Sequence, residues 1–207
     1  MSLAQALSEF KASITQCESL IVNAHKTDGG GAPILPPVDQ QQITVAAFLN
    51  MFIAWETFLE SVVGKLMTGD ATISGNGPTK YVAPPNIEAA RKMLIGVGRY
   101  FDYGNHANVR KIVEIYFENG YPFQPHLGAI FSELEDLRVM RNASAHISST
   151  TQRALDSLAG RILGQPAPGI DLYRLLTTTD PRSPSGETVF GAYRTKLVVV
   201  AEIIAQG

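Results

Sequence analysis

The chain has 207 residues, of which 45% are hydrophobic and 17% are charged, and its formal net charge at pH 7 is −2. This much apolar material excludes a globally disordered chain, and the near-neutral charge argues against the strongly basic surface of a duplex-binding protein. The single cysteine, Cys17, excludes an internal disulfide framework and is typical of a reducing cytoplasm.

Apolar residues at alternating spacings of three and four predict two long helices in the first third of the chain. The first helix is expected over residues 3–25, with Ser2 and Gln5 as a capping box at its start and Cys17 as a buried packing residue. The second is expected over residues 41–67, where a row of aromatic and aliphatic side chains forms a seam for other helices.

Shorter helices follow a loop at residues 69–85, and Asn86 is the predicted N-cap of the next one. They are expected at about residues 87–97, 107–118, 125–141, 150–163 and 190–204. No alternating strand pattern accompanies them, so the predicted fold class is all-α, a bundle of about six to eight helices.

No targeting or membrane-spanning pattern is evident in the sequence. The first residues lack the charged-then-apolar layout of a signal peptide, and apolar runs such as residues 197–201 are far too short to cross a bilayer. We therefore expect a cytoplasmic protein without a membrane partner, forming a single domain over residues 1–207.

One arginine interrupts the apolar pattern of the helix expected at residues 125–141. The stripe through Leu127, Leu134 and Leu137 extends to Arg141, where an apolar side chain would be expected. A buried guanidinium needs a partner or a polar site. Alternatively, the stem of Arg141 packs at a helix end while its head reaches solvent, or the head pairs with Glu135 or Asp136.

Arg141 also begins the sequence Arg141-Asn142-Ala143-Ser144-Ala145-His146, which has the form R-N-x-x-x-H. With this motif the chain resembles the HEPN superfamily of helical-bundle proteins, and in particular the RiboL-PSP type of HEPN domain. A Trp55-Glu56 pair in the long helix and a Pro85-Asn86 helix start add to the resemblance, which covers roughly residues 45–151. The motif-bearing core would then span about residues 41–163, with an extension at 164–207.

The resemblance implies a metal-independent endoribonuclease that cleaves single-stranded RNA and acts as a homodimer with a composite site. His146 would serve as general base or acid, Arg141 would hold the scissile phosphate, Asn142 would orient the pair, and Glu56 would be a supporting acidic residue. Such a protein would be a toxin or an antiviral defence effector, regulated by an antitoxin or another partner.

Helical geometry limits how Arg141 and His146 can meet. Residues five apart on an ideal helix lie about 140° apart around the axis. The two side chains therefore converge only if the helix bends or ends between them, or if a second copy of the chain completes the site.

Other familiar kinds of site have no pattern in this sequence. The four histidines lack metal-ligand spacing and the glycines at 29–31 are not followed by the residues of a phosphate loop, so neither a metal nor a cofactor is expected. The alternative interpretation of the protein is a non-catalytic HEPN-like module for dimerisation or protein interaction. His146 would then be a residue that favours a helix C-terminus.

Overall fold

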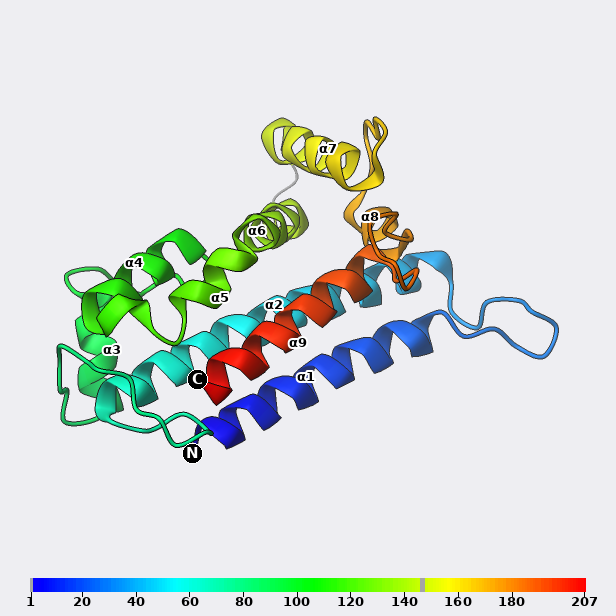
Figure 1. Ribbon diagram of the computed structural model, residues 1–207. Helices are drawn as coiled ribbons and strands as arrows, with labels where there is room; N and C mark the ends of the chain where they lie inside the picture. The colour runs from blue at the N-terminus through cyan, green and yellow to red at the C-terminus, as the bar shows by residue number, and fades with distance from the viewer. Residues whose placement is uncertain (1, 146–147) are drawn as a thin grey trace. The chain divides into compact units, whose positions relative to one another are not determined.

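The computed structural model describes residues 2–145 and 148–207, and these residues form an all-α structure, as the sequence predicts. Nine α-helices and one 3-10 helix lie in these ranges, and β-pairing there is limited to three isolated bridges. The elements, labelled in Figure 1, are α1 Leu3–Ala24, α2 Pro37–Thr68, α3 Ile87–Ile95, α4 His106–Tyr116, η1 Glu118–Gly120, α5 Gln124–Ala129, α6 Phe131–Ala145, α7 Ser149–Leu163, α8 Leu172–Thr177 and α9 Val189–Gln206.

The chain divides into two compact units. Unit 1 consists of Met1–Lys11, Ala54–Leu134 and Lys196–Gly207, and unit 2 consists of Ala12–Ile53 and Glu135–Thr195. Helices α1, α2, α6 and α9 therefore contribute residues to both units. Each unit has its own buried apolar side chains.

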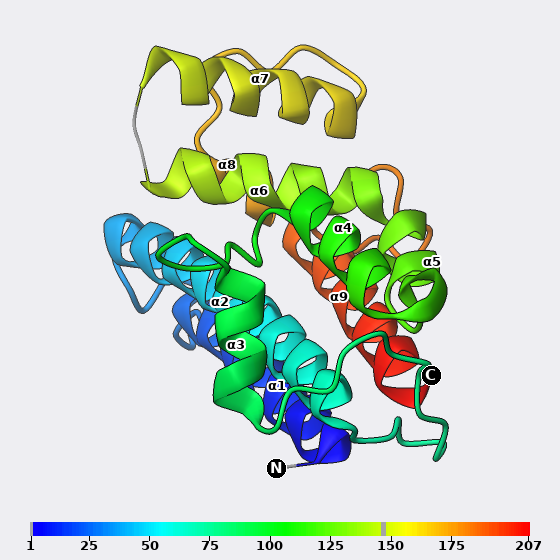
Figure 2. The ribbon, with the colours of Figure 1, turned by 90° about the vertical axis from the view of Figure 1, so that its left-hand side faces the viewer.

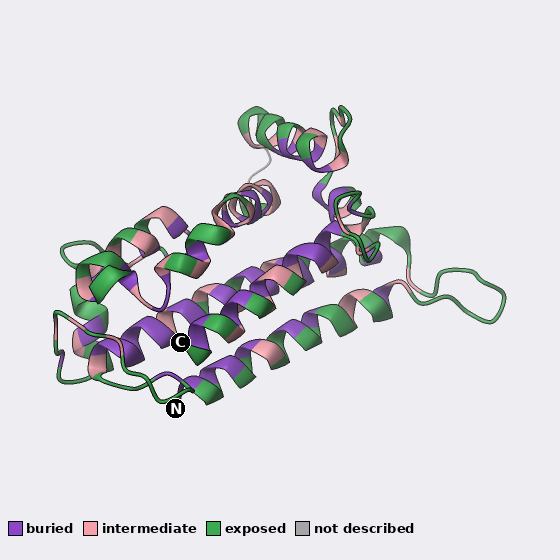
Figure 3. Ribbon diagram, viewed as in Figure 1, coloured by how far each residue is buried: buried purple, intermediate pink, exposed green. Residues whose placement is uncertain are grey.

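The core of unit 1 is built on the second half of α2. The ring of Phe10 from α1 lies 6.0 Å from the ring of Trp55 and 5.2 Å from that of Phe58, measured between centroids. The indole N–H of Trp55 donates a hydrogen bond of 3.0 Å to Nε2 of His106, a wholly buried residue at the start of α4. The aromatic row predicted along this helix is thus a packing surface, which Figure 3 shows in purple.

Helix α2 is long and apolar enough to cross a membrane by length and composition alone, the one such helix in the described part of the chain. The core helix of a soluble protein passes the same test. Trp55, Leu59 and Val62 are fully buried within unit 1. Burial of this kind accounts for the apolar sequence of α2, which is compatible with a soluble protein.

Local capping signals in the sequence are confirmed. The Ser2 half of the predicted capping box forms, since the backbone N–H of Gln5 donates to Ser2 Oγ at 3.2 Å, whereas the Gln5 side chain donates to Glu9 Oε1 at 3.0 Å. Helix α1 ends at Ala24, one residue before the predicted end. The backbone N–H of Ala89 donates to Asn86 Oδ1 at 2.9 Å, so Asn86 caps α3 as expected. Each cap satisfies a backbone donor that the helix itself leaves without a partner.

The prediction of a single helix over residues 125–141 is wrong, because the helix is interrupted at Ile130. Helix α5 ends at Ala129, and Ile130 adopts φ −114° and ψ 24°, outside the helical region. Its backbone N–H bonds to the carbonyl of Gly128, and α6 begins at Phe131. The apolar spacing is the same with or without this break, so hydrophobic periodicity does not reveal it.

The structure also overturns the expected burial of Arg141. Along α6 the buried positions turn from Leu134 and Leu137 toward Met140, whereas Arg141 is exposed. The buried face of α6 therefore does not include Arg141. The guanidinium is solvated and needs no buried partner.

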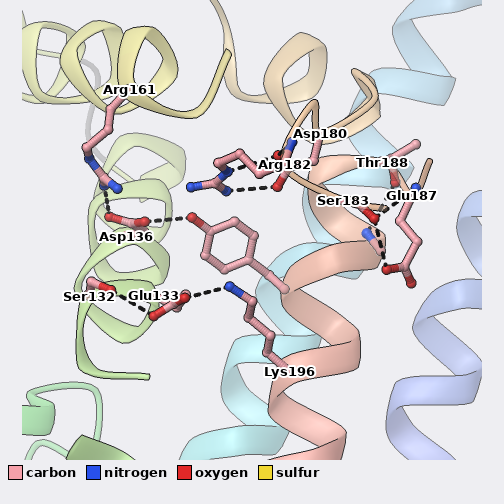
Figure 4. A network of polar contacts seen from close by, with 12 residues as sticks. Ser132, Glu133, Asp136, Arg161, Asp180, Arg182, Ser183, Glu187, Thr188 and Lys196 are labelled. Atoms are coloured by element: carbon pink, nitrogen blue, oxygen red, sulfur yellow. Dashed lines mark hydrogen bonds and ion pairs between the residues drawn. The ribbon is translucent and has the colours of Figure 1, made fainter. Parts of the chain in front are cut away.

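A buried carboxylate holds α6 in place within unit 2 (Figure 4). Asp136 is 5% exposed, and its Oδ2 accepts a 2.6 Å hydrogen bond from the hydroxyl of Tyr193 on α9. Its Oδ1 forms an ion pair with Arg161 on α7. Figure 2 shows α6 and α7 side by side and running in opposite directions, which brings Arg161, near the end of α7, to Asp136, near the start of α6.

A second ion pair extends this network to the loop before α9. Arg182 donates two parallel hydrogen bonds to the buried Asp180, from Nε to Oδ1 at 2.9 Å and from Nη2 to Oδ2 at 2.8 Å. The guanidinium also lies 6.0 Å from the centroid of the Tyr193 ring. The hydrogen bonds to Asp180 are the main cause of the raised pKa of Arg182. Tyr193 is therefore held between a carboxylate and a guanidinium.

Figure 4 also shows an ion pair that belongs to unit 1. Lys196 Nζ on α9 lies 2.5 Å from Oε1 of Glu133, in the first turn of α6. Partial burial acts to raise the pKa of Glu133, but the hydrogen bonds from Lys196 and Ser132 outweigh it and lower the pKa overall. The carboxylate therefore stays charged and paired at neutral pH.

Tyr193→Phe should lower the free energy of unfolding by about 1.5–3 kcal/mol, because it removes a hydrogen bond to a charged, buried group. Urea denaturation followed by circular dichroism measures the change. The matched control is Tyr116→Phe, since the Tyr116 hydroxyl donates to the backbone oxygen of Met93 at an exposed site. The control should cost no more than about 0.5 kcal/mol. Equal losses in the two variants would contradict the importance of the Asp136 contact.

Alkaline pH should destabilise the protein through the same tyrosine. Burial, and secondly the hydrogen bond to Asp136, raise the pKa of Tyr193 above the value of about 10 for an unfolded chain. Its contribution to stability is thus complete below about pH 10 and is lost as the pH rises further. Urea titrations between about pH 9 and about pH 11 should show a steeper loss of stability for the wild type than for Tyr193→Phe. Equal slopes would show that Tyr193 titrates normally.

Candidate functional site

The last turns of α6 carry the first two residues of the R-N-x-x-x-H motif. Arg141 is exposed and Asn142 is half-buried. One guanidinium nitrogen of Arg141, Nη1, donates to Asn142 Oδ1 at 3.2 Å, so the two side chains are held together. The hydroxyl of Ser144 donates to the backbone oxygen of Arg141 at 2.6 Å. The motif therefore has an ordered polar surface at the end of the helix.

The carboxylates near Arg141 on the same helix already have other partners. Glu135 lies 3.6 Å from Arg138 Nη1, in the i,i+3 pairing that the sequence suggests. Asp136 is bound by Arg161 and Tyr193. Across residues 2–145 and 148–207, Arg141 forms no ion pair. The alternative in which Arg141 pairs with Glu135 or Asp136 is therefore wrong, because both carboxylates have other partners in the described chain.

The position of Arg141 suits it to bind an anion. A guanidinium has five N–H donors, and Asn142 accepts from one of them. The remaining donors form a planar fork that fits the oxygens of a phosphate. Because the head of Arg141 is solvated, an anion can approach it without breaking an existing ion pair.

His146, the last residue of the motif, lies outside the described residues. Helix α6 extends to Ala145, so residues 141–145 are helical throughout. On the other side, Ser148 caps α7 with a capping box: the N–H of Thr151 donates to Ser148 Oγ at 3.2 Å and the N–H of Ser148 donates to Thr151 Oγ1 at 3.0 Å. The segment that contains His146 is thus bounded by two defined helix ends.

Glu56, the predicted supporting residue, lies on α2 and is half-buried. It belongs to unit 1, whereas Arg141 belongs to unit 2, and their contact stays a prediction. Its neighbour Trp55 is a core residue that bonds to His106. Sequence periodicity predicts the burial of Trp55, but no local signal pairs it with a histidine 51 positions away.

No group of three or more His, Cys, Asp or Glu side chains that could hold a metal ion is found among the residues that the structure describes. Cys17 is buried as predicted, and burial raises the pKa of its thiol. A buried thiol of this kind is a packing residue and a poor nucleophile.

The polar network around Asp136 is the feature of the site that sequence patterns miss. It positions the helix that carries Arg141, yet Asp136 and Tyr193 are 57 residues apart in the chain. The available signal is weak: Asp136 neighbours Leu137 on the apolar side of the helix, and Tyr193 falls in the apolar row of the last helix.

Comparisons of the chain with family models, with curated proteins and with solved structures found no match. The resemblance to HEPN domains therefore depends on the motif and its helical setting alone.

Proposed function

We propose that the protein is a metal-independent endoribonuclease of the HEPN type that cleaves single-stranded RNA. The observation that carries the proposal is the state of Arg141, which is exposed at the end of a firmly anchored helix, bonded to Asn142, and without a carboxylate partner in the described chain. In this state Arg141 keeps its charge and most of its N–H donors for an anionic ligand.

The proposed reaction needs no group beyond the side chains of the motif. His146 accepts the proton of the ribose 2′-OH, the 2′ oxygen attacks the phosphorus, and the bond to the 5′ oxygen breaks. The leaving 5′ oxygen takes a proton from an imidazolium, and the products are a 2′,3′-cyclic phosphate and a 5′-OH. Arg141 stabilises the negative charge that develops on the phosphate oxygens, while Asn142 fixes the direction of the guanidinium.

The active form in this proposal is a homodimer with composite sites. Residues five apart on an ideal helix lie about 140° apart around its axis, and α6 is helical from Arg141 to Ala145. A second copy of the chain would supply the missing half of each site. Glu56 is proposed as a supporting residue, and a cytoplasmic toxin or defence effector controlled by an antitoxin or other regulator is the proposed setting.

A non-catalytic interaction module is the second candidate. It is favoured by four apolar side chains of unit 2 that are more than half exposed: Val22, Ile34, Val38 and Ile53. Such a module would form a stable dimer or bind a partner protein without cutting RNA.

Purified protein in EDTA should cleave a mixed single-stranded RNA pool, and His146→Ala should lower the rate by about 100- to 10,000-fold, the contribution typical of general acid–base groups. Arg141→Ala should lower it by about 100- to 1,000-fold, since it removes transition-state charge stabilisation. Gel electrophoresis of the RNA, with chemical identification of the product ends, measures both effects.

Arg138→Ala is the matched control, because this arginine lies one turn earlier on α6 and is paired with Glu135. It should cleave RNA at the wild-type rate. Cleavage that survives in His146→Ala would show that the activity comes from another site or a contaminant. A stable dimer with no cleavage in any variant would favour the interaction module.

Mixing the two inactive variants tests the composite site. In a symmetric dimer, Arg141→Ala and His146→Ala chains together rebuild one complete site from the intact Arg141 of one copy and the intact His146 of the other. Random pairing should restore about a quarter of the wild-type activity, because half of the dimers are mixed and each has one of two sites intact. No recovery, despite proven exchange of subunits, would assign both residues of a site to a single chain.

A further inference from the structure

A small pocket with both aromatic and charged walls lies within unit 1. Its volume is about 180 Å³, well below the range of about 300–1,000 Å³ that is typical of pockets for drug-sized ligands. It is formed by α2, α3 and the chain between α3 and α4. The side chains that define it are those of Glu60, Arg91, Leu94, Tyr100, Phe101 and Tyr103. A pocket of this size suits a single aromatic ring system.

The aromatic residues of the pocket range from buried to strongly exposed. Tyr103 is 8% exposed and its ring meets the ring of Phe101 edge to face, with 4.8 Å between centroids. Tyr100 is 74% exposed, so most of its ring is open to solvent at the mouth of the pocket. Leu94 is buried and adds an apolar surface. An exposed ring beside the Phe101–Tyr103 ring pair provides a surface on which a planar ligand can stack.

An ion pair lies among these rings. Arg91 Nε is 2.8 Å from Glu60 Oε1, and the two side chains are 57% and 35% exposed. This contact uses Nε of Arg91 and Oε1 of Glu60, and the Nη groups and Oε2 are further donors and an acceptor of the same side chains. The pair therefore offers donors and an acceptor next to one another at the same pocket.

Tyr103 is close enough to the ion pair to be affected by it. Burial, and secondly the Glu60 carboxylate, raise the pKa of Tyr103. The phenol consequently remains protonated at neutral and moderately alkaline pH. This leaves Glu60 as the negatively charged acceptor of the pocket and Arg91 as its cationic donor.

We propose that this pocket binds a guanine base, stacked on the aromatic side chains and read by Glu60 and Arg91. Guanine presents, along one edge, a carbonyl oxygen followed by two N–H donors. A carboxylate can accept both N–H groups, and a neighbouring guanidinium can donate to the carbonyl oxygen. The adjacent Arg91 and Glu60 match this order of acceptor and donors.

The same chemistry rejects the other purine. Adenine has an unprotonated ring nitrogen where guanine has its ring N–H, so its lone pair would face the Glu60 carboxylate. It also has an amino group where guanine has the carbonyl, so a donor would face Arg91. Hypoxanthine keeps the ring N–H and the carbonyl but lacks the 2-amino group, and it should bind with intermediate strength.

The proposal does not depend on ribonuclease activity, because base recognition requires no cleavage. A guanine base could reach the pocket either as a free nucleotide or as an unstacked residue of single-stranded RNA, in which bases are commonly read by stacking and edge contacts. The phosphate and sugar would remain outside a pocket of about 180 Å³.

Isothermal titration calorimetry with the full chain tests the pocket, using guanosine, inosine and adenosine 5′-monophosphates as probes. The wild type should bind them in that order of decreasing affinity. Glu60→Gln should weaken guanosine monophosphate binding about tenfold or more and reduce the preference over inosine monophosphate. Tyr100→Ala should weaken the guanosine and inosine ligands to a similar degree, because stacking does not distinguish them.

Glu88→Gln is the matched control, since Glu88 pairs with Lys92 at 2.9 Å on the exposed side of α3 and lies outside the pocket. It should bind guanosine monophosphate like the wild type. Circular dichroism checks that each variant is folded. The proposal is overturned if the wild type binds adenosine and guanosine monophosphates equally, or if Glu60→Gln binds guanosine monophosphate as tightly as the wild type does.

A 2′-O-methyl oligouridylate with one guanosine distinguishes the two sources of the base, because it cannot be cleaved by attack of a 2′-OH. If this oligonucleotide binds more tightly than both guanosine monophosphate and the oligouridylate without guanosine, the base comes from RNA. If guanosine monophosphate binds at least as tightly as the oligonucleotide, the ligand is a free nucleotide. Absence of binding by both probes at millimolar concentration would overturn the proposal.

Discussion

The geometry of unit 2 depends on how one buried carboxylate, that of Asp136, obtains its partners. A charged group is costly to bury unless hydrogen bonds and an opposite charge replace the water it loses. Asp136 receives both, a hydroxyl from Tyr193 on α9 and a guanidinium from Arg161 on α7. Because the partners come from two other helices, satisfying the charge also fixes α6 between them, and Arg141 follows less than two turns later on the same helix.

The partners of the acidic residues on α6 also determine which cation remains available. Arg161 forms an ion pair with Asp136, and Arg138 forms one with Glu135. Arg141 is left with the neutral Asn142, which orients its guanidinium without cancelling its charge. Helix α6 thus pairs Arg138 with a carboxylate but leaves Arg141 charged and bonded only to a neutral amide, and such an arginine is suited to an anionic ligand.

Sequence patterns predict the features that depend on neighbouring residues. The caps at Ser2 and Asn86 require contacts over three positions, and the burial of Trp55 follows from helical spacing. The break at Ile130 is different, because apolar residues before and after it keep a helical spacing while the backbone does not. The Asp136 network and the Glu60–Arg91 pair join residues distant in sequence, so tertiary packing alone decides whether those side chains meet.

A chain with a net charge of −2 cannot rely on a broad positive surface to hold RNA. Phosphate contacts supply most of the affinity of basic proteins and carry no sequence information, whereas contacts to base edges supply specificity. A nuclease with few phosphate contacts must draw more of its binding energy from stacking and edge hydrogen bonds. In the two proposals, Arg141 would therefore contact a phosphate and the pocket lined by Glu60, Arg91 and Tyr100 would contact a base. A near-neutral net charge would keep binding to unrelated nucleic acids weak.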